Sequence, residues 1–276
     1  MHIERDFTPM VNPKRIVAQS NLISKLEKMK TEMITLDYPA PGFLTPKTSK
    51  YSGFGYIPKS QPYPTNSHGQ PLSLLAQINF DEMPHIEHYP STGILGFYID
   101  CFDENLGYDA YNPTDRSGFK VLYFENTDEP YHNTTEVNAL FDQYDDDEQY
   151  PISNGEIKLS GTLTPDAFPF NAIEFENYFG MDFESFLYEK FDTASSDVGD
   201  YLYQRYAPSR LKIGGYPFFT QEDSRAKSSP YNKLLLQIAS DLYDITWQDD
   251  VLAHFFISEE DLKNRNFDNV IYDWDI

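Results

Sequence analysis

The chain contains one cysteine, Cys101, among its 276 residues. One cysteine cannot form an internal disulfide and cannot build a thiolate metal cluster. The sequence also lacks any run of about 18 apolar residues, the length that a membrane-spanning helix needs. Residues 1–6 are charged and have no apolar centre, so they do not resemble a secretory signal. These absences predict a protein of the cytoplasm with no membrane partner.

Positive charge is scarce. The chain has 21 Lys and Arg against 44 Asp and Glu, for a formal net charge of −23 and a pI near 4.4. Such a surface repels phosphate backbones, so we expect no binding to nucleic acid or to anionic membranes. It would attract a basic protein or a cation instead. Acidity also serves solubility alone, and charge by itself does not separate these two interpretations.

Catalytic and cofactor motifs are absent as well. Gly53 and Gly55 lack the third glycine of a phosphate-binding loop, and neither Gly-Lys-Ser/Thr nor Gly-x-Ser-x-Gly occurs. The segment 85–88 (His-Ile-Glu-His) lacks metal-ligand spacing and lies between prolines, which predicts an exposed loop. The acidic run 142–148 lacks the central glycine of a calcium loop. We therefore predict no catalytic residue, no metal and no cofactor.

What the chain has in quantity is aromatic side chains and turn formers: 21 Tyr, 21 Phe, 19 Pro and 14 Gly. This composition favours short strands joined by turns. The apolar spacing predicts a helix over 13–33 and one or two helices over 173–206, broken near 193–197. Strands are expected at 72–80, 93–102, 119–125 and 157–163.

Three blocks of sequence recur in the same order: 53–56 resembles 215–218, 74–78 resembles 234–238, and 97–99 resembles 255–257. Asp81 and Asp241 also correspond. The offset between the copies changes by only two residues from block to block. The pattern predicts an α+β fold of largely antiparallel sheets with internal duplication, plus an N-terminal helix and a mid-chain helical segment.

The domain organisation follows from the same pattern. We expect one domain over 1–276, with a helical leader over 1–42 and repeat copies at about 49–103 and 211–262. The two copies should share one hydrophobic interior. Gln77 and Gln237 lie inside apolar strands, where each amide needs a partner. Bonds to backbone groups are the expected solution, because most buried polar side chains find them there.

The repeated blocks resemble the YwqG-like family of uncharacterised, mostly bacterial proteins. The segments that carry the resemblance are 49–58, 71–78, 214–221, 235–241 and 255–262, with 267–274 after them. The chain departs from the family pattern at 52–55 (Ser-Gly-Phe-Gly) and at 247–250 (Trp-Gln-Asp-Asp). The resemblance implies a compact α+β fold with extensive sheet, and it implies no reaction.

Six residues are the candidates for a ligand-binding site, because aromatic faces and amides suit sugars and peptides. They are Tyr216, Gln221, Gln77, Gln237, Trp247 and His254. For each, a structural role in core or turn is the alternative. His254 is also a possible general base, although no nucleophile can be placed beside it from sequence.

The leading functional hypothesis is a non-enzymatic interaction protein that binds a basic protein, for example an immunity-type protein that covers a basic nuclease. The alternative is a hydrolase-like or small-ligand binding protein, for a sugar or a peptide, with a pocket between the repeats.

Overall fold

The computed structural model describes residues 13–39, 42–145, 148–150, 152–153, 155–191, 195–221, 223–240 and 251–275. Its helices are α1 (Pro13–Glu27), α2 (Thr134–Phe141), α3 (Ile173–Phe179), α4 (Phe183–Phe191), α5 (Ser195–Arg205) and α6 (Glu259–Lys263), with a 3-10 turn η1 (Phe80–Glu82). Its strands are β1 (Thr31–Asp37), β2 (Lys50–Tyr51), β3 (Ser73–Asn79), β4 (Ile94–Ile99), β5 (Phe119–Phe124), β6 (Ile157–Lys158), β7 (Ser160–Asp166), β8 (Lys212–Gly214), β9 (Lys233–Ala239), β10 (Leu252–Ile257) and β11 (Val270–Asp275).

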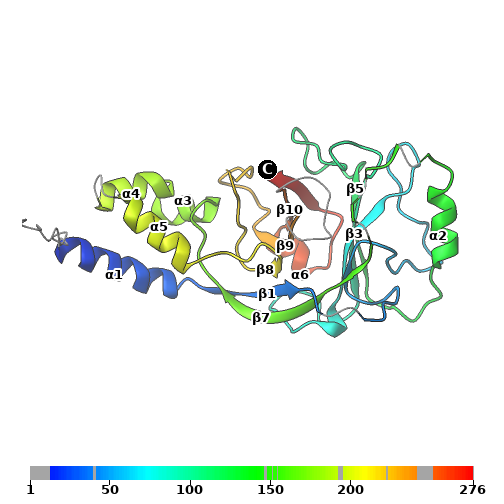
Figure 1. Ribbon diagram of the computed structural model, residues 1–276, viewed down its shortest axis with the longest axis horizontal. Helices are drawn as coiled ribbons and strands as arrows, with labels where there is room; N and C mark the ends of the chain where they lie inside the picture. The colour runs from blue at the N-terminus through cyan, green and yellow to red at the C-terminus, as the bar shows by residue number, and fades with distance from the viewer. Residues whose placement is uncertain are drawn as a thin grey trace, which may run out of the picture.

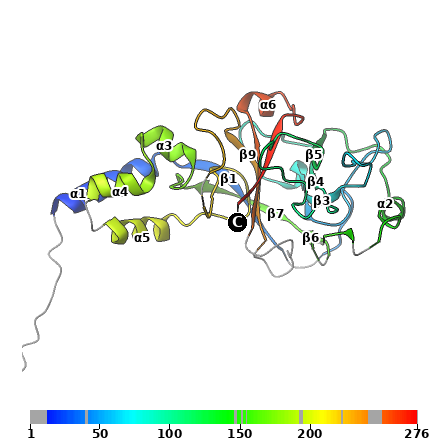
Figure 2. The same cartoon turned by 90° about the horizontal axis from the view of Figure 1, so that it is seen from above.

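The strands form two antiparallel sheets, a six-stranded one in the order β11-β10-β9-β8-β1-β7 and a five-stranded one in the order β5-β4-β3-β2-β6. The molecule is elongated, with α1, α3, α4 and α5 extending as a helical arm beyond one side of the six-stranded sheet (Figure 1). In the view from above, α6 lies at the edge of the sheet region and α2 lies at the end away from the arm (Figure 2). The predicted α+β class with antiparallel sheets is confirmed.

The internal duplication is visible in the strand registers. Gln77 on β3 lies opposite Gly96 on β4, and Gln237 on β9 lies opposite His254 on β10. Each strand pair also has a one-residue irregularity at the equivalent place: it lies between Leu74 and Ala76 on β3 and between Leu234 and Leu236 on β9. A bulge adds one residue to one strand and increases its twist. Two strand pairs with the same register and the same bulge are the same unit used twice.

The two copies bury the same face against each other. Phe97 of the first copy and Phe255, its equivalent in the second, have ring centroids 4.9 Å apart. Both belong to one core that also contains Ile78 and Ile238, another equivalent pair. Because equivalent residues meet, the copies are related by an approximate two-fold axis near these rings.

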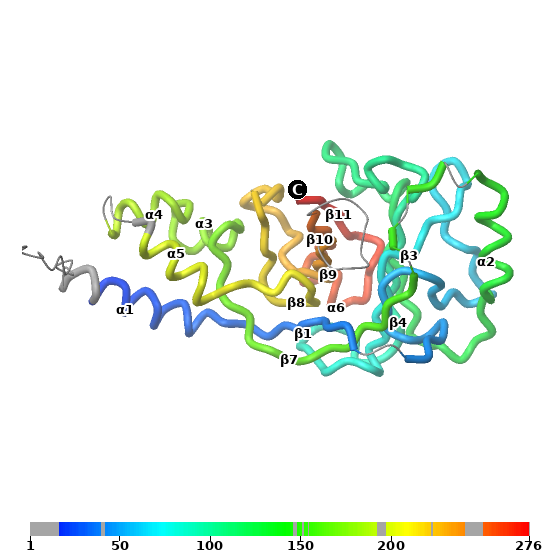
Figure 3. Tube along the Cα trace, viewed as in Figure 1, coloured from blue at the N-terminus to red at the C-terminus, as the bar shows by residue number. Residues whose placement is uncertain are grey.

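The N-terminal helix is shorter than its apolar spacing predicts. The helix α1 ends at Glu27, and Met33 belongs to β1, which pairs with both β7 and β8. The β-branched residues Thr31, Ile34 and Thr35 favour a strand, and hydrogen bonds to neighbouring strands on both sides override the helical spacing. The paired strands β1 and β7 run together from the arm into the sheets (Figure 3).

The helical segment over 173–206 contains three helices instead of one or two. A first break falls at Gly180, whose φ of 78° ends α3 in the left-handed conformation. Helix α4 ends at Phe191 and α5 begins at Ser195, close to the break predicted near 193–197. The arm has its own aromatic core, in which Phe170 stacks on Phe183 with centroids 4.4 Å apart. No helix within the described residues is long and apolar enough to cross a bilayer.

The shared core predicts that the two copies unfold together. Replacing Phe97 or Phe255 with Ala should each cost about 3–5 kcal/mol, because a large buried ring leaves a cavity. The double variant should be non-additive, since the rings touch. Denaturant unfolding followed by near-UV and far-UV circular dichroism checks this. Separate transitions for the two halves would contradict a common interior.

Candidate functional site

Each copy places a buried lysine beside its glutamine. In the first copy Lys50 pairs in register with Gln77, and its Nζ donates to the carbonyl of Phe54 at 2.8 Å. The carboxylate of Glu156 lies 3.4 Å from Nζ and accepts a second hydrogen bond, from the backbone N–H of Phe54, at 2.9 Å. Burial lowers the pKa of Lys50, and Glu156 works against that shift.

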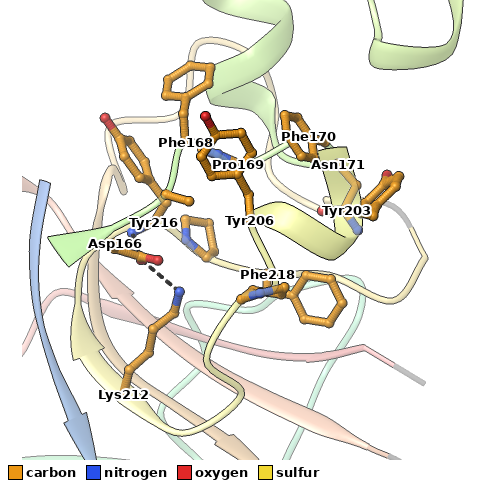
Figure 4. A pocket seen from close by; sticks show the side chains of 13 residues that line it. Asp166, Phe168, Pro169, Phe170, Asn171, Tyr203, Tyr206, Lys212, Tyr216 and Phe218 are labelled. Atoms are coloured by element: carbon orange, nitrogen blue, oxygen red, sulfur yellow. Dashed lines mark hydrogen bonds and ion pairs between the residues drawn. The ribbon is translucent and has the colours of Figure 1, made fainter. Parts of the chain in front are cut away.

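The second copy repeats the arrangement with Lys212 and Asp166. Lys212 pairs in register with Gln237, and its Nζ donates to Asp166 Oδ2 at 2.8 Å (Figure 4). The same oxygen accepts the backbone N–H of Tyr216 at 2.9 Å. This pair is deeper than the first, because the Lys212 and Asp166 side chains are 1% and 3% exposed. Burial lowers the pKa of Lys212, and the Asp166 carboxylate opposes it.

A glycine turn brings each carboxylate to its backbone N–H. Gly53 and Gly215 have φ values of 79° and 72°, in the region that favours glycine. A Cβ at Gly53 would overlap the side chain of Glu156, and a Cβ at Gly215 would overlap the carboxylate of Asp166. Both positions therefore need glycine for conformation and for space.

The two glutamines hold the segments that flank each lysine. Gln77 Oε1 accepts the N–H of Tyr56 at 2.6 Å, and Gln237 Oε1 accepts the N–H of Phe218 at 2.8 Å. Their amide nitrogens donate to the carbonyls of Thr48 and Ser209, respectively. Both side chains are fully buried. Gln77 and Gln237 are thus equivalent structural links between backbone segments, as their strand context predicts.

His254 is the second group that fixes Phe218. Its Nε2 lies 2.9 Å from the carbonyl of Phe218, and since a carbonyl only accepts, Nε2 carries the hydrogen. Burial lowers the pKa of His254 to about 3, so the ring is neutral. Its Nδ1 then offers a lone pair, has no hydrogen-bond partner among the described residues, and lies 3.9 Å from Asp273 Oδ2. Burial raises the pKa of Asp273 to about 6.

The remaining candidates are dispersed. Tyr216 is partly buried, donates its hydroxyl to the carbonyl of Met29 at 2.9 Å, and borders the cavity described below. Gln221 is exposed and donates its backbone N–H to Asp275 Oδ1 at 3.2 Å. Trp247 lies outside the described residues, as does Asp241. The structure therefore brings together Gln237, His254 and Tyr216 around the turn at 215–218, and it leaves Gln77 in the other copy.

A small cavity adjoins the Lys212–Asp166 pair. It has a volume of about 20 Å³ and lies between the second copy and the helical arm. Its wall is largely aromatic, and its polar members are Lys212, Asp166 and Asn171 (Figure 4). The aromatic members are Phe168, Phe170, Tyr203, Tyr206, Tyr216 and Phe218.

A wide groove continues from this cavity along the arm. The two share Phe170, Asn171 and Tyr203 as lining residues, and the groove has a volume of about 930 Å³. Among its described lining residues, the carboxylates are Glu176, Asp182, Glu184, Asp200 and Asp223, and the cations are Arg225 and Lys227. Arg225 is bound by Asp223 and Glu174, and Lys227 forms an ion pair with Glu176. The groove, named here the acidic groove, is therefore negative.

Neither the two lysines nor their carboxylates are among the site residues predicted from the sequence. Lys50 and Lys212 are 162 residues apart, the same offset as Gly53 and Gly215, so extending the first repeat block by three residues would have revealed them. Glu156 and Asp166 carry no such signal, because they lie in the segment that joins the copies and have no counterparts in the repeat.

These features define a duplicated α+β protein with one buried lysine–carboxylate pair in each copy. Residues 49–276 match the family described as a domain of unknown function, DUF1963, and the chain belongs to this family. The match begins one residue before β2 and includes both copies, whereas α1 and β1 precede it. No curated protein matches the chain.

The two lysine pairs should differ in their contribution to stability. Replacing Asp166 with Asn keeps the shape but leaves Lys212 without a counter-charge, and we expect a loss of about 3–5 kcal/mol. Glu156→Gln is the matched change in the first copy and should cost less, because the Glu156 side chain is 29% exposed and Lys50 keeps the Phe54 carbonyl. Urea unfolding at neutral pH measures both. Adding Lys212→Met to Asp166→Asn should recover most of the loss; a double variant as unstable as the single one would contradict the charge explanation.

Asp273 should make the protein respond to pH in an unusual direction. Its folded pKa of about 6 exceeds the ordinary value of 3.8, so the folded state holds this proton more tightly. Its contribution to stability therefore grows as the pH falls from 7 to 5, by about 1 kcal/mol. His254 has the opposite effect, because its pKa is lowered.

Comparison with Asp273→Asn isolates the carboxyl group, since His254 is present in both proteins. Relative to the variant, the parent should gain about 1 kcal/mol in free energy of unfolding between pH 7 and pH 5. Urea unfolding at the two pH values measures the difference. If the free energy of unfolding differs between parent and variant by the same amount at pH 7 and at pH 5, Asp273 titrates at its ordinary pKa.

Proposed function

We propose that this protein is a non-enzymatic binding protein for a basic protein partner, and that the acidic groove is the contact surface. The observation that carries the proposal is the groove's charge: its lining carboxylates outnumber its cations, and both cations are already paired. The net charge of −23 extends the same sign over the whole chain. Opposite charge speeds encounter with a basic partner and selects against acidic ones.

The groove also offers what a stable contact needs beyond charge. Its floor includes the buried Phe183 and Leu187, and Tyr203 on its rim is 41% exposed. Interfaces are enriched in tyrosine, which gives large contact area at small entropic cost. A partner with lysine or arginine side chains around an apolar segment fits this composition.

One form of this function is of the immunity type, in which the chain covers the basic active-site face of a nuclease. We also propose that the chain is a YwqG-like member of its family, on the motifs at 49–58 and 214–221. We propose that binding takes place in the reducing cytoplasm. The one cysteine, Cys101, is a buried free thiol, which suits that compartment.

Capture of partners on the full-length chain, at low and at moderate salt, tests the proposal. We expect a stoichiometric basic protein whose affinity falls as salt rises. Removing two groove charges by Glu184→Gln with Asp200→Asn should then weaken that affinity about tenfold, by isothermal titration calorimetry. The matched control is Glu125→Gln with Asp128→Asn, which removes two exposed charges that follow β5 of the five-stranded sheet.

The control variant should bind nearly as tightly as the parent, because its charges are remote from the groove. Equal weakening by both variants would show that only the overall charge matters, and it would overturn the assignment of the groove. Failure to retain any stoichiometric basic protein at either salt concentration would overturn the proposed function.

A further inference from the structure

The two copies differ in how completely they satisfy their lysine. An ammonium group carries three donors. In the first copy, Lys50 Nζ has a carbonyl and a carboxylate as partners. In the second, Lys212 Nζ has one hydrogen-bond partner among the described residues, Asp166 Oδ2, although the two lysines are equally buried. Lys212 therefore keeps donors in a place that water reaches poorly.

These donors border the cavity at the end of the acidic groove. Its volume of about 20 Å³ admits one group of the size of a hydroxyl. A ligand group in this cavity has the Lys212 ammonium as a hydrogen-bond donor and the Asp166 carboxylate as an acceptor (Figure 4). An anion would be repelled by Asp166 and a cation by Lys212. A hydroxyl suits both, because it accepts one hydrogen bond and donates another.

The surroundings indicate what the hydroxyl is attached to. A ligand that extends from the cavity into the acidic groove passes Phe170 and Tyr203, which line both. Aromatic faces bind the C–H surfaces of a saturated ring, and a few placed polar groups fix its orientation. Outside the cavity, exposed carboxylates such as Glu184 and Asp200 can accept further hydroxyl groups.

We propose that this cavity is a subsite for a saccharide or polyol, with one hydroxyl between Lys212 and Asp166 and the carbon skeleton against Tyr203. Divergence between the copies supports the assignment: among the described residues Lys212 has fewer hydrogen-bond partners than Lys50, and Lys212 lines a largely aromatic cavity. The proposal does not rest on the basic partner, and it is tested on the chain alone.

The test is saturation-transfer NMR on the full chain with D-glucose, D-ribose and myo-inositol at millimolar concentrations. Tetrahydropyran, a saturated ring without hydroxyl groups, is the negative probe. We expect transfer to at least one polyhydroxyl probe and none to tetrahydropyran. Absence of transfer to all three polyhydroxyl probes, or equal transfer to tetrahydropyran, overturns the proposal.

Variants assign the binding to the cavity. Tyr203→Ala should weaken binding of the responding probe about tenfold, because it removes an aromatic wall. Tyr201→Ala is its control, since Tyr201 is similarly exposed, at 40%, on the same helix but does not line the cavity. Lys212→Met should abolish binding, whereas Lys50→Met, the equivalent change in the first copy, should preserve it.

If Lys212→Met fails to fold, the Tyr203 and Tyr201 pair decides the matter by itself. Undiminished binding in Tyr203→Ala places the probe elsewhere and overturns the proposal. Equal weakening by Tyr201→Ala does so as well.

Discussion

The structure depends on two lysines that are buried inside sheets and on the carboxylates that neutralise them. Neither Glu156 nor Asp166 belongs to a repeat copy; both lie in the long segment, about 104–210, that joins the two copies. A buried ammonium without a counter-charge is costly, so each sheet needs that segment in place. The same carboxylates also hold the glycine turns after β2 and β8, through the N–H groups of Phe54 and Tyr216. The connecting segment is therefore part of the core of both halves.

The turn at 215–218 shows how such constraints shape a potential site. Its backbone is fixed by Asp166 at Tyr216, and by Gln237 and His254 at Phe218. The turn forms one wall of the cavity, and the helical arm forms the other. The arm has a hydrophobic cluster of its own, whereas the sheets share theirs. The cavity and the acidic groove thus lie where two separately packed bodies meet, a common place for ligands.

Features that depend on neighbouring residues in the chain could be predicted from the sequence. The repeat, the strands at 72–80, 93–102 and 119–125, and the role of Gln77 and Gln237 followed from short motifs, because strand burial dictates residue type at each step. The single strand predicted at 157–163 is instead two, β6 and β7, which belong to different sheets. Sequence reasoning failed for β1, where Met33 continues a helical spacing but hydrogen bonds to two neighbouring strands decide the conformation. It also failed for Glu156, just before β6, and for Asp166, the last residue of β7, since neither position gives a local sign of the distant lysine it pairs with. Long-range pairing is the information that local periodicity lacks.

The contact between Phe97 and Phe255 has a meaning for the history of the chain. Two equivalent residues that meet across an approximate two-fold axis reproduce the geometry of a symmetric homodimer within a single polypeptide. In a true homodimer, any substitution would appear on both sides at once. In a single chain, equivalent positions can hold different residues. Position 96 is a glycine, whereas its counterpart at 254 is a histidine that fixes a turn. Within one chain the two halves can differ at such positions while both keep the interior that they share.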